Sequence, residues 1–251
     1  MNTRNEERRD LALATAGVQL RAAGDDQGVR GFDGHAAVFN QRTAIGNPLT
    51  WGFYEEVAPG AFTKTLAEGD ARYLVDHDTR LVVSRVSAGS LRLAQDETGL
   101  AVDSDLDTRL SYVGDLVVNL ENKNITGMSF GFRTVKDDWT TVTVQTSEGD
   151  LEAELRTIRE VQLFEVSAVT FPAYEGTDVA VRSVGMALAA RGDDDAFARR
   201  AAHRPELLTY RHEPAATAAT RGSDATQPGE TTGGRQARQM ELLAARYRLA
   251  R

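Results

Sequence analysis

The sequence of 251 residues predicts a mainly β protein with a few helices, an α+β fold. Short apolar or alternating segments follow one another from about residue 11 to residue 171, with turn-forming residues between them. The clearest helical spacing of apolar residues is confined to residues 110–120. The regular alternation of strands and helices that builds a parallel sheet is missing. The length allows one good-sized domain plus extensions, or two small domains.

The first half of the chain predicts short strands and one short helix. Residues 1–8 are polar, and we expect them to be frayed. A short helix is expected over residues 61–69, because Pro59 stands near its start and Phe62 and Leu66 lie one turn apart. Strands are expected at residues 18–20, 36–39, 71–75, 90–93 and 100–102, the last two joined as a hairpin.

The second half predicts the main helix and the longer strands. The helix is defined by a stripe of apolar residues at helical spacing: Leu110, Val113, Leu116, Val117 and Leu120. A strand around Ser129 follows it. Residues 140–146 and 151–160 then predict a hairpin, and residues 161–171 a buried strand that ends before Pro172.

The composition changes after about residue 183. Alanine, arginine, aspartate, threonine and glycine dominate, so residues 185–234 are expected to be a low-complexity linker. Residues 235–251 predict a basic helix, with five arginines against one glutamate. This tail is either a docking helix on a flexible extension or a solvated end without a role.

The composition also excludes several classes of function. A net charge of −8 argues against general binding to nucleic acid or to an anionic membrane. Cysteine is absent, so disulfides, thiolate catalysis and the usual zinc sites are excluded. Phosphate-binding glycine motifs and histidine ligand pairs are missing too, so we expect no cofactor and no metal. Without a signal peptide or a spanning segment, a soluble intracellular protein is expected.

A serine between two glycines, in the segment Gly127-Met128-Ser129-Phe130-Gly131, is the leading candidate for a nucleophile. On a strand, Ser129 and the glycines share one face, which leaves room for the backbone of an extended peptide. The segment also matches the nucleophile elbow of α/β-hydrolases. That interpretation fails, because the only later histidines, His203 and His212, lie in the expected tail. The alternative is that Ser129 is an ordinary small strand residue.

Two further residues supply the chemistry that a nucleophilic serine needs. His77 ends an apolar strand between Asp76 and Asp78, so it is a candidate general base, or otherwise a surface loop histidine. Glu165 stands in an apolar run, where a carboxylate is costly unless it is paired. It could orient the imidazole, or it could pair with Arg133 or Arg159. Asp76 and Asp78 are weaker candidates for the orienting role.

These residues stand in a wider pattern. From about residue 31 to residue 181 the chain resembles the prohead (capsid maturation) proteases of tailed bacteriophages. The landmarks of that family occur here in order, at residues 34–40, 56–62, 75–78, 97–100, 127–132 and 164–169, closing on Pro172-Ala173. Each landmark is short, and their order makes the resemblance specific.

The resemblance has implications for fold and activity. The family looks like a relative of the herpesvirus assemblin proteases, which implies a closed or partly closed β-barrel, surrounded by a few helices, over residues 9–184. It implies a serine endopeptidase with Ser129 as nucleophile and His77 as general base. Glu165 matches the position of the third catalytic residue, which is a histidine in the herpesvirus enzymes.

The resemblance also implies partners and a location. The expected substrates are the scaffold segment of the major capsid protein, or a separate scaffold protein, and the enzyme itself. Cleavage would take place inside the immature prohead in the host cytoplasm. The basic helix at residues 235–251 could bind scaffold and then be removed by self-cleavage. The alternative function is a non-catalytic capsid-assembly module with a protease-like fold.

Overall fold

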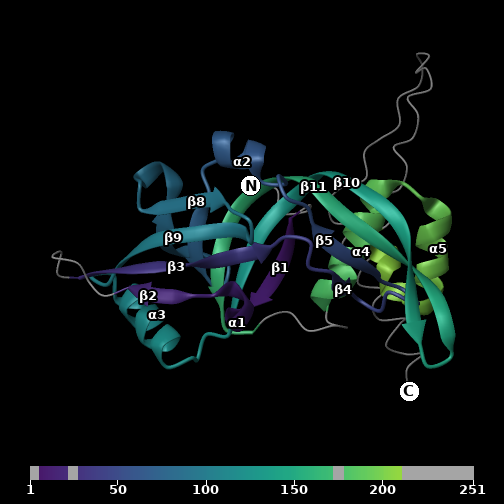
Figure 1. The fold of residues 1–251 in the computed structure, drawn as a ribbon, viewed down its shortest axis with the longest axis horizontal. Helices are drawn as coiled ribbons and strands as arrows, with labels where there is room; N and C mark the ends of the chain where they lie inside the picture. The colour runs from purple at the N-terminus through teal and green to yellow at the C-terminus, as the bar shows by residue number, and fades with distance from the viewer. Residues whose placement is uncertain (1–5, 22–27, 172–177, 211–251) are drawn as a thin grey trace, which may run out of the picture. The chain divides into compact units, whose positions relative to one another are not determined.

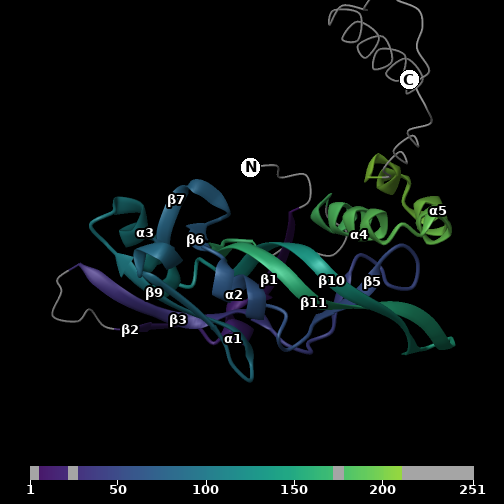
Figure 2. The same ribbon diagram turned by 90° about the horizontal axis from the view of Figure 1, so that it is seen from above.

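One long antiparallel hairpin organises the fold. In the computed structural model, which describes residues 6–21, 28–171 and 178–210, strand β10 (Gly127–Thr146) pairs with strand β11 (Gly149–Val169) from end to end. The two strands run side by side in both ribbon views (Figures 1 and 2). The sequence pattern predicts several shorter strands here, whereas the structure has two long ones. Shifts of register along the hairpin let each strand bend without ending.

The hairpin is the centre of the larger of two sheets. Strand β1 (Glu7–Ala12) pairs with the outer edge of β10. The opposite edge of β11 pairs in parallel with two strands in succession, β5 (Phe53–Val57) and β6 (Arg72–Val75). The sheet is completed by β4 (Thr43–Ile45), which pairs with β5, and by β7 (Asp78–Arg85), which pairs with β6.

The smaller sheet is antiparallel. Its strands follow the order β2 (Gln19–Arg21), β3 (Val29–Val38), β9 (Gly99–Asp107) and β8 (Leu91–Gln95). The hairpin predicted between residues 90–93 and 100–102 is confirmed as β8–β9.

The closed or partly closed barrel implied by the resemblance is not what the structure contains. Within the described residues, β1, β4 and β7 end one sheet, and β2 and β8 end the other. The physical reason lies in β11, which pairs with two different strands along the same edge. The sheet therefore branches at β11 instead of continuing around to close. The broader expectation of a mainly β fold with a few helices is confirmed.

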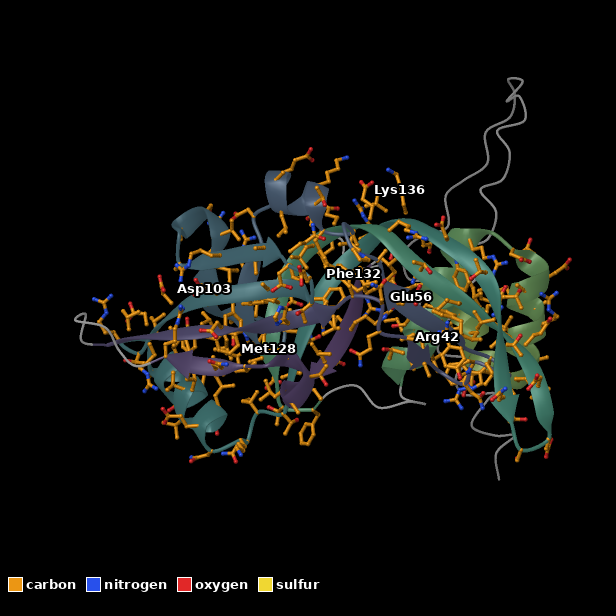
Figure 3. All side chains as sticks on the ribbon, in the orientation of Figure 1. Arg42, Glu56, Asp103, Met128, Phe132 and Lys136 are labelled. Carbon is orange, nitrogen blue, oxygen red and sulfur yellow. The ribbon has the colours of Figure 1, made fainter. Side chains whose placement is uncertain are left out.

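Alternating side chains of β10 form the middle of the main core. Met128, Phe130 and Phe132 are at most 3% exposed and pack with apolar residues of both sheets. Met128 and Phe132 lie in the interior, whereas Lys136 lies at the surface farther along the same strand (Figure 3). The residues between them in sequence, Ser129 and Gly131, belong to the opposite face of the strand.

The helices of the first 171 residues cover this core. They are α1 (Leu13–Ala16), α2 (Thr63–Glu68), the 3-10 turn η2 (Val86–Ala88) and α3 (Ser111–Glu121). The predicted short helix is confirmed as α2, and the predicted main helix as α3. Of the predicted apolar stripe of α3, Leu110 precedes the helix and is 42% exposed, while the other four residues are buried. No helix in the described part of the chain has the length and apolar character needed to cross a membrane.

The expected linker is wrong for residues 185–210. This segment contains most of α4 (Asp178–Arg191), all of α5 (Asp194–His203) and the 3-10 helix η3 (Pro205–Tyr210). The helices lie to one side of the long hairpin (Figure 2). They bury a second core against the loop around Trp51, with members such as Val184, Leu188 and Phe197. The segment is rich in alanine, so its few larger apolar residues were not recognised as a helical pattern in the sequence. The rest of the linker and residues 235–251 lie outside the described residues.

The expectation of a frayed start is also wrong for Glu7 and Arg8, which belong to β1.

A buried network of charges anchors that strand. Arg156 of β11, 1% exposed, donates to Glu7 at 2.8 Å and to Glu55 at 3.1 Å. Arg9 donates to the same two carboxylates, each at 2.8 Å. β1 is thereby tied to β5 and β11 by opposite charges.

The network controls the ionisation of Glu7. Burial by itself would raise the pKa of Glu7, but the guanidinium groups of Arg156 and Arg9 lower it from 4.5 to about 2. Hydrogen bonds from Arg156 and Thr134 act in the same direction. The charged form of Glu7 is therefore stabilised by folding.

Glu7→Gln is expected to destabilise the protein by about 3 kcal/mol at pH 7, because it leaves the buried Arg156 under-compensated. The folded pKa of Glu7 lies below its unfolded value, so the stabilisation is present above pH 4.5 and is lost as the pH falls toward 2. Urea unfolding at several pH values measures both effects. The gap between wild type and variant should narrow below pH 4.5, and a gap of constant size would contradict the assignment. Glu97→Gln, at an exposed turn residue, is the control.

Candidate active site

His77 lies in a tight, strained turn. Val75 pairs with Asp78 across the β6–β7 hairpin, so Asp76 and His77 form a two-residue loop. Both have positive φ angles, 46° for Asp76 and 60° for His77. Hairpin loops with this backbone usually contain glycine or asparagine, and a non-glycine residue here costs about 1–3 kcal/mol. Strain of this kind persists only where the surroundings fix the backbone.

The end of β11 fixes this turn. The backbone N–H of Thr170 donates to the Asp76 carboxylate at 2.8 Å, and the Thr170 hydroxyl does so at 3.0 Å. The Asp76 N–H donates to the carbonyl of Ala168 at 2.9 Å. The His77 N–H donates to the hydroxyl of Ser167 at 3.2 Å. These bonds offset the strain and hold the imidazole over the sheet.

The imidazole meets a buried carboxylate. His77 Nδ1 and Glu165 Oε1 are 2.6 Å apart, and the two side chains are 12% and 7% exposed. Ser167 donates to the other carboxylate oxygen, Oε2, at 2.6 Å. With its proton on Nδ1, a neutral imidazole presents Nε2 as an acceptor. This is the state that a general base requires.

Ser129 shares the face that carries Glu165. In the hairpin register Ser129 lies opposite Ser167, and Gly131 lies opposite Glu165. Residues opposite one another in an antiparallel pair project to the same face. The structure thus places Ser129 and Glu165 on one face of the β10–β11 pair, and His77 reaches this face through its contact with Glu165. The Ser129 side chain is buried, and its hydroxyl donates to the backbone carbonyl of Arg9 at 3.1 Å.

The absence of a side chain at Gly131 serves the packing of Glu165. The spacing of the glycines predicts that the space beside them receives the backbone of a substrate. In the structure, a Cβ at residue 131 would collide with Oε1 of Glu165. Gly131 therefore makes room for the carboxylate that binds His77.

The alternative partners of Glu165 and His77 are engaged elsewhere. Arg133 donates to Gln162 at 2.5 Å, and Arg159 donates to Asp138 at 2.8 Å. Asp78 accepts hydrogen bonds from Arg80, which lower the pKa of Asp78 to about 2. Asp76 binds Thr170. Among the described residues, Glu165 is the carboxylate that contacts the His77 imidazole.

Two of the other histidines belong to other elements of the fold, and the third lies outside the described residues. His35, on β3 of the smaller sheet, contacts Asp96 at 2.8 Å. His203 ends α5. His212 lies outside the described residues, as does the Pro172-Ala173 landmark. His77 is the histidine that the structure places with Glu165.

Sequence reasoning missed two residues of the site. Ser167 contacts both His77 and Glu165, and Thr170 holds the turn through Asp76. A signal for Ser167 was present, because it stands two residues from Glu165 in an apolar strand and so shares its face. Thr170 offers no comparable signal, because its partner lies far away in sequence.

A histidine bound to a carboxylate, with a serine on the same face, is the combination of side chains that serine hydrolases use. Residues 17–191 match the sequence pattern of the caudovirus prohead serine proteases, and the chain belongs to this family. It is 31% identical over 167 residues to the prohead protease of Enterobacteria phage HK97. That match covers 65% of this chain and 64% of the HK97 protein. The comparison with solved structures gives no match.

Gly131→Ala is expected to push the Glu165 carboxylate away from His77 and to destabilise the fold by about 1–3 kcal/mol through overpacking. A crystal structure and urea unfolding of the variant measure these effects. An intact His77–Glu165 hydrogen bond at wild-type stability would refute the role given to Gly131. The control is Gly114→Ala in α3, where the new Cβ would be 3.7 Å from its nearest neighbour, the carbonyl oxygen of Thr108. The gain in helix propensity should make that change neutral or stabilising.

Proposed function

We propose that this chain is a serine endopeptidase of phage head maturation, with Ser129 as nucleophile, His77 as general base and Glu165 as the residue that orients His77. The observation that carries the proposal is the 2.6 Å contact between His77 Nδ1 and Glu165 Oε1, on the sheet face that bears Ser129. The family membership of the chain supports the same chemistry.

The first chemical step is the activation of the serine. The Ser129 hydroxyl turns from the Arg9 carbonyl toward Nε2 of His77, which accepts its proton. The resulting alkoxide attacks the carbonyl carbon of a peptide bond. Glu165 keeps the proton of the neutral ring on Nδ1 and stabilises the imidazolium that forms.

The second half of the reaction regenerates the enzyme. The imidazolium gives its proton to the leaving amine, and an acyl-enzyme ester remains on Ser129. His77 then activates a water molecule, which hydrolyses the ester and releases the acid product. The same histidine therefore acts as base and as acid in each half, which requires a fixed ring orientation.

We propose as substrates the scaffold segment of the major capsid protein or a separate scaffold protein, and this chain itself. The site of action would be the immature prohead in the host cytoplasm. The support is the family match together with the printed name of the HK97 relative, a prohead protease. The matched part of this chain spans less than two thirds of that relative, so the substrates are inferred from the family.

Co-expression with the capsid protein of the same virus, followed by intact mass spectrometry, tests the function. Wild type should shorten the capsid protein or itself, and Ser129→Ala should shorten neither, because the nucleophile is gone. Ser111→Ala, at an exposed residue of α3, is the control and should cleave normally. Cleavage by Ser129→Ala would place the nucleophile elsewhere. Assembled shells with no cleavage in any sample would favour the non-catalytic assembly module.

Glu165→Gln tests the orienting residue. The amide keeps the shape of the carboxylate but cannot stabilise an imidazolium, so kcat should fall by about a thousandfold or more with little change in KM. A peptide spanning the mapped cleavage site provides the assay. The matched control is Glu160→Gln on the same strand, whose carboxylate binds Lys136 at the surface at 2.6 Å. Equal effects of the two variants would remove Glu165 from the mechanism.

A further inference from the structure

Ser167 is a fully buried hydroxyl that contacts two members of the proposed catalytic set. Its side chain has an exposure of 0%. The hydroxyl donates to Glu165 Oε2 at 2.6 Å and accepts from the His77 N–H at 3.2 Å. Its donor and one of its acceptor positions are therefore both used within the site.

The strand places Ser167 at the centre of the site. Glu165 and Ser167 are two residues apart on β11, so their side chains share a face. Ser167 also lies directly opposite Ser129 in the hairpin register. One small residue thus stands between the serine, the histidine turn and the carboxylate.

We propose that Ser167 is a positioning residue of the peptidase, acting through Glu165 and through the backbone of His77. This inference rests on the proposed function of Ser129, His77 and Glu165. Ser167 fixes one oxygen of the carboxylate, which leaves Oε1 directed at Nδ1 of His77. It also holds the strained backbone of the turn, in which His77 has a φ of 60°.

Ser167 restrains two rotations. A carboxylate with a single hydrogen bond can turn about its terminal bond, which is a soft torsion. A turn of positive φ relaxes when its backbone N–H loses a buried partner. Either rotation moves the imidazole away from the geometry that accepts the serine proton, so the expected loss lies in kcat and not in KM.

A buried serine elsewhere in the chain gives a matched control. Ser104 of β9 has an exposure of 0%, and its hydroxyl lies 2.7 Å from that of Ser84. It belongs to the smaller sheet and contacts none of the three proposed catalytic residues among the bonds of the described chain. Ser104→Ala therefore removes a comparable buried hydrogen bond without touching the site.

The experiment compares Ser167→Ala, Ser167→Thr and Ser104→Ala in the full chain, with a peptide that spans the mapped cleavage site. We expect Ser167→Ala to lower kcat about 10- to 100-fold with little change in KM, as for the loss of a hydrogen bond to a charged group. Ser167→Thr, which keeps the hydroxyl, should recover much of that loss. Ser104→Ala should leave both constants unchanged.

A second readout does not depend on turnover. In the Ser129→Ala background, the proton on His77 Nδ1 should give a downfield NMR signal from its short hydrogen bond to Glu165. Adding Ser167→Ala should weaken or abolish the signal, and adding Ser104→Ala should preserve it. An unchanged signal with an unchanged kcat, equal losses in Ser104→Ala, or a threonine variant no better than alanine would overturn the positioning role.

The two proposals fail in different ways. An inactive wild type, or an active Ser129→Ala variant, refutes the proposed function and leaves the NMR comparison to decide whether Ser167 positions His77. Normal catalysis that depends on Ser129 but not on Ser167 refutes only the positioning role.

Discussion

The register of the β10–β11 hairpin is the constraint on which the rest of the structure depends. It sets Ser129 against Ser167 and Gly131 against Glu165, and it sends Met128, Phe130 and Phe132 to the core on the other side. A slip of one residue would exchange the two faces, turning Ser129 toward the apolar core and Met128, Phe130 and Phe132 toward the face that carries Glu165. Core packing therefore enforces the alignment of the site, because the same strand carries both.

The turn that carries His77 in the candidate site is strained, and hydrogen bonds to residues at and just after the end of β11 offset the strain. Asp76 and His77 adopt a backbone of positive φ. It is held by the hydrogen bond that Thr170 donates to Asp76 and by the one that the His77 N–H donates to Ser167. These bonds fix the position of the imidazole. A two-residue turn has little freedom, so the imidazole is held by its backbone as well as by Glu165. Gly131 completes the arrangement, because only a residue without a side chain leaves space for that carboxylate.

The N-terminal strand links the site to a buried charge network. Arg9 and Glu7 of β1 pair with Glu55 and Arg156, while the backbone carbonyl of Arg9 accepts the Ser129 hydroxyl. A network of this kind stabilises little compared with apolar packing, but breaking it is costly because a charge is left buried and unpaired. It therefore fixes the position of β1 beside β10.

The sequence by itself determined the mainly β class, the helices α2 and α3, the β8–β9 hairpin, the family, and the candidates Ser129, His77 and Glu165. These follow from local periodicity, turn residues and the order of short motifs, all of which are written along the chain. Only the tertiary structure decided that the sheets branch instead of closing, that residues 185–210 are helical, and that Glu165 binds His77 and not Arg133 or Arg159. It also decided the contacts of Ser167 and Thr170 and the use of Gly131. The physical reason is that these features depend on pairing between residues distant in sequence, and a local pattern does not specify its partner.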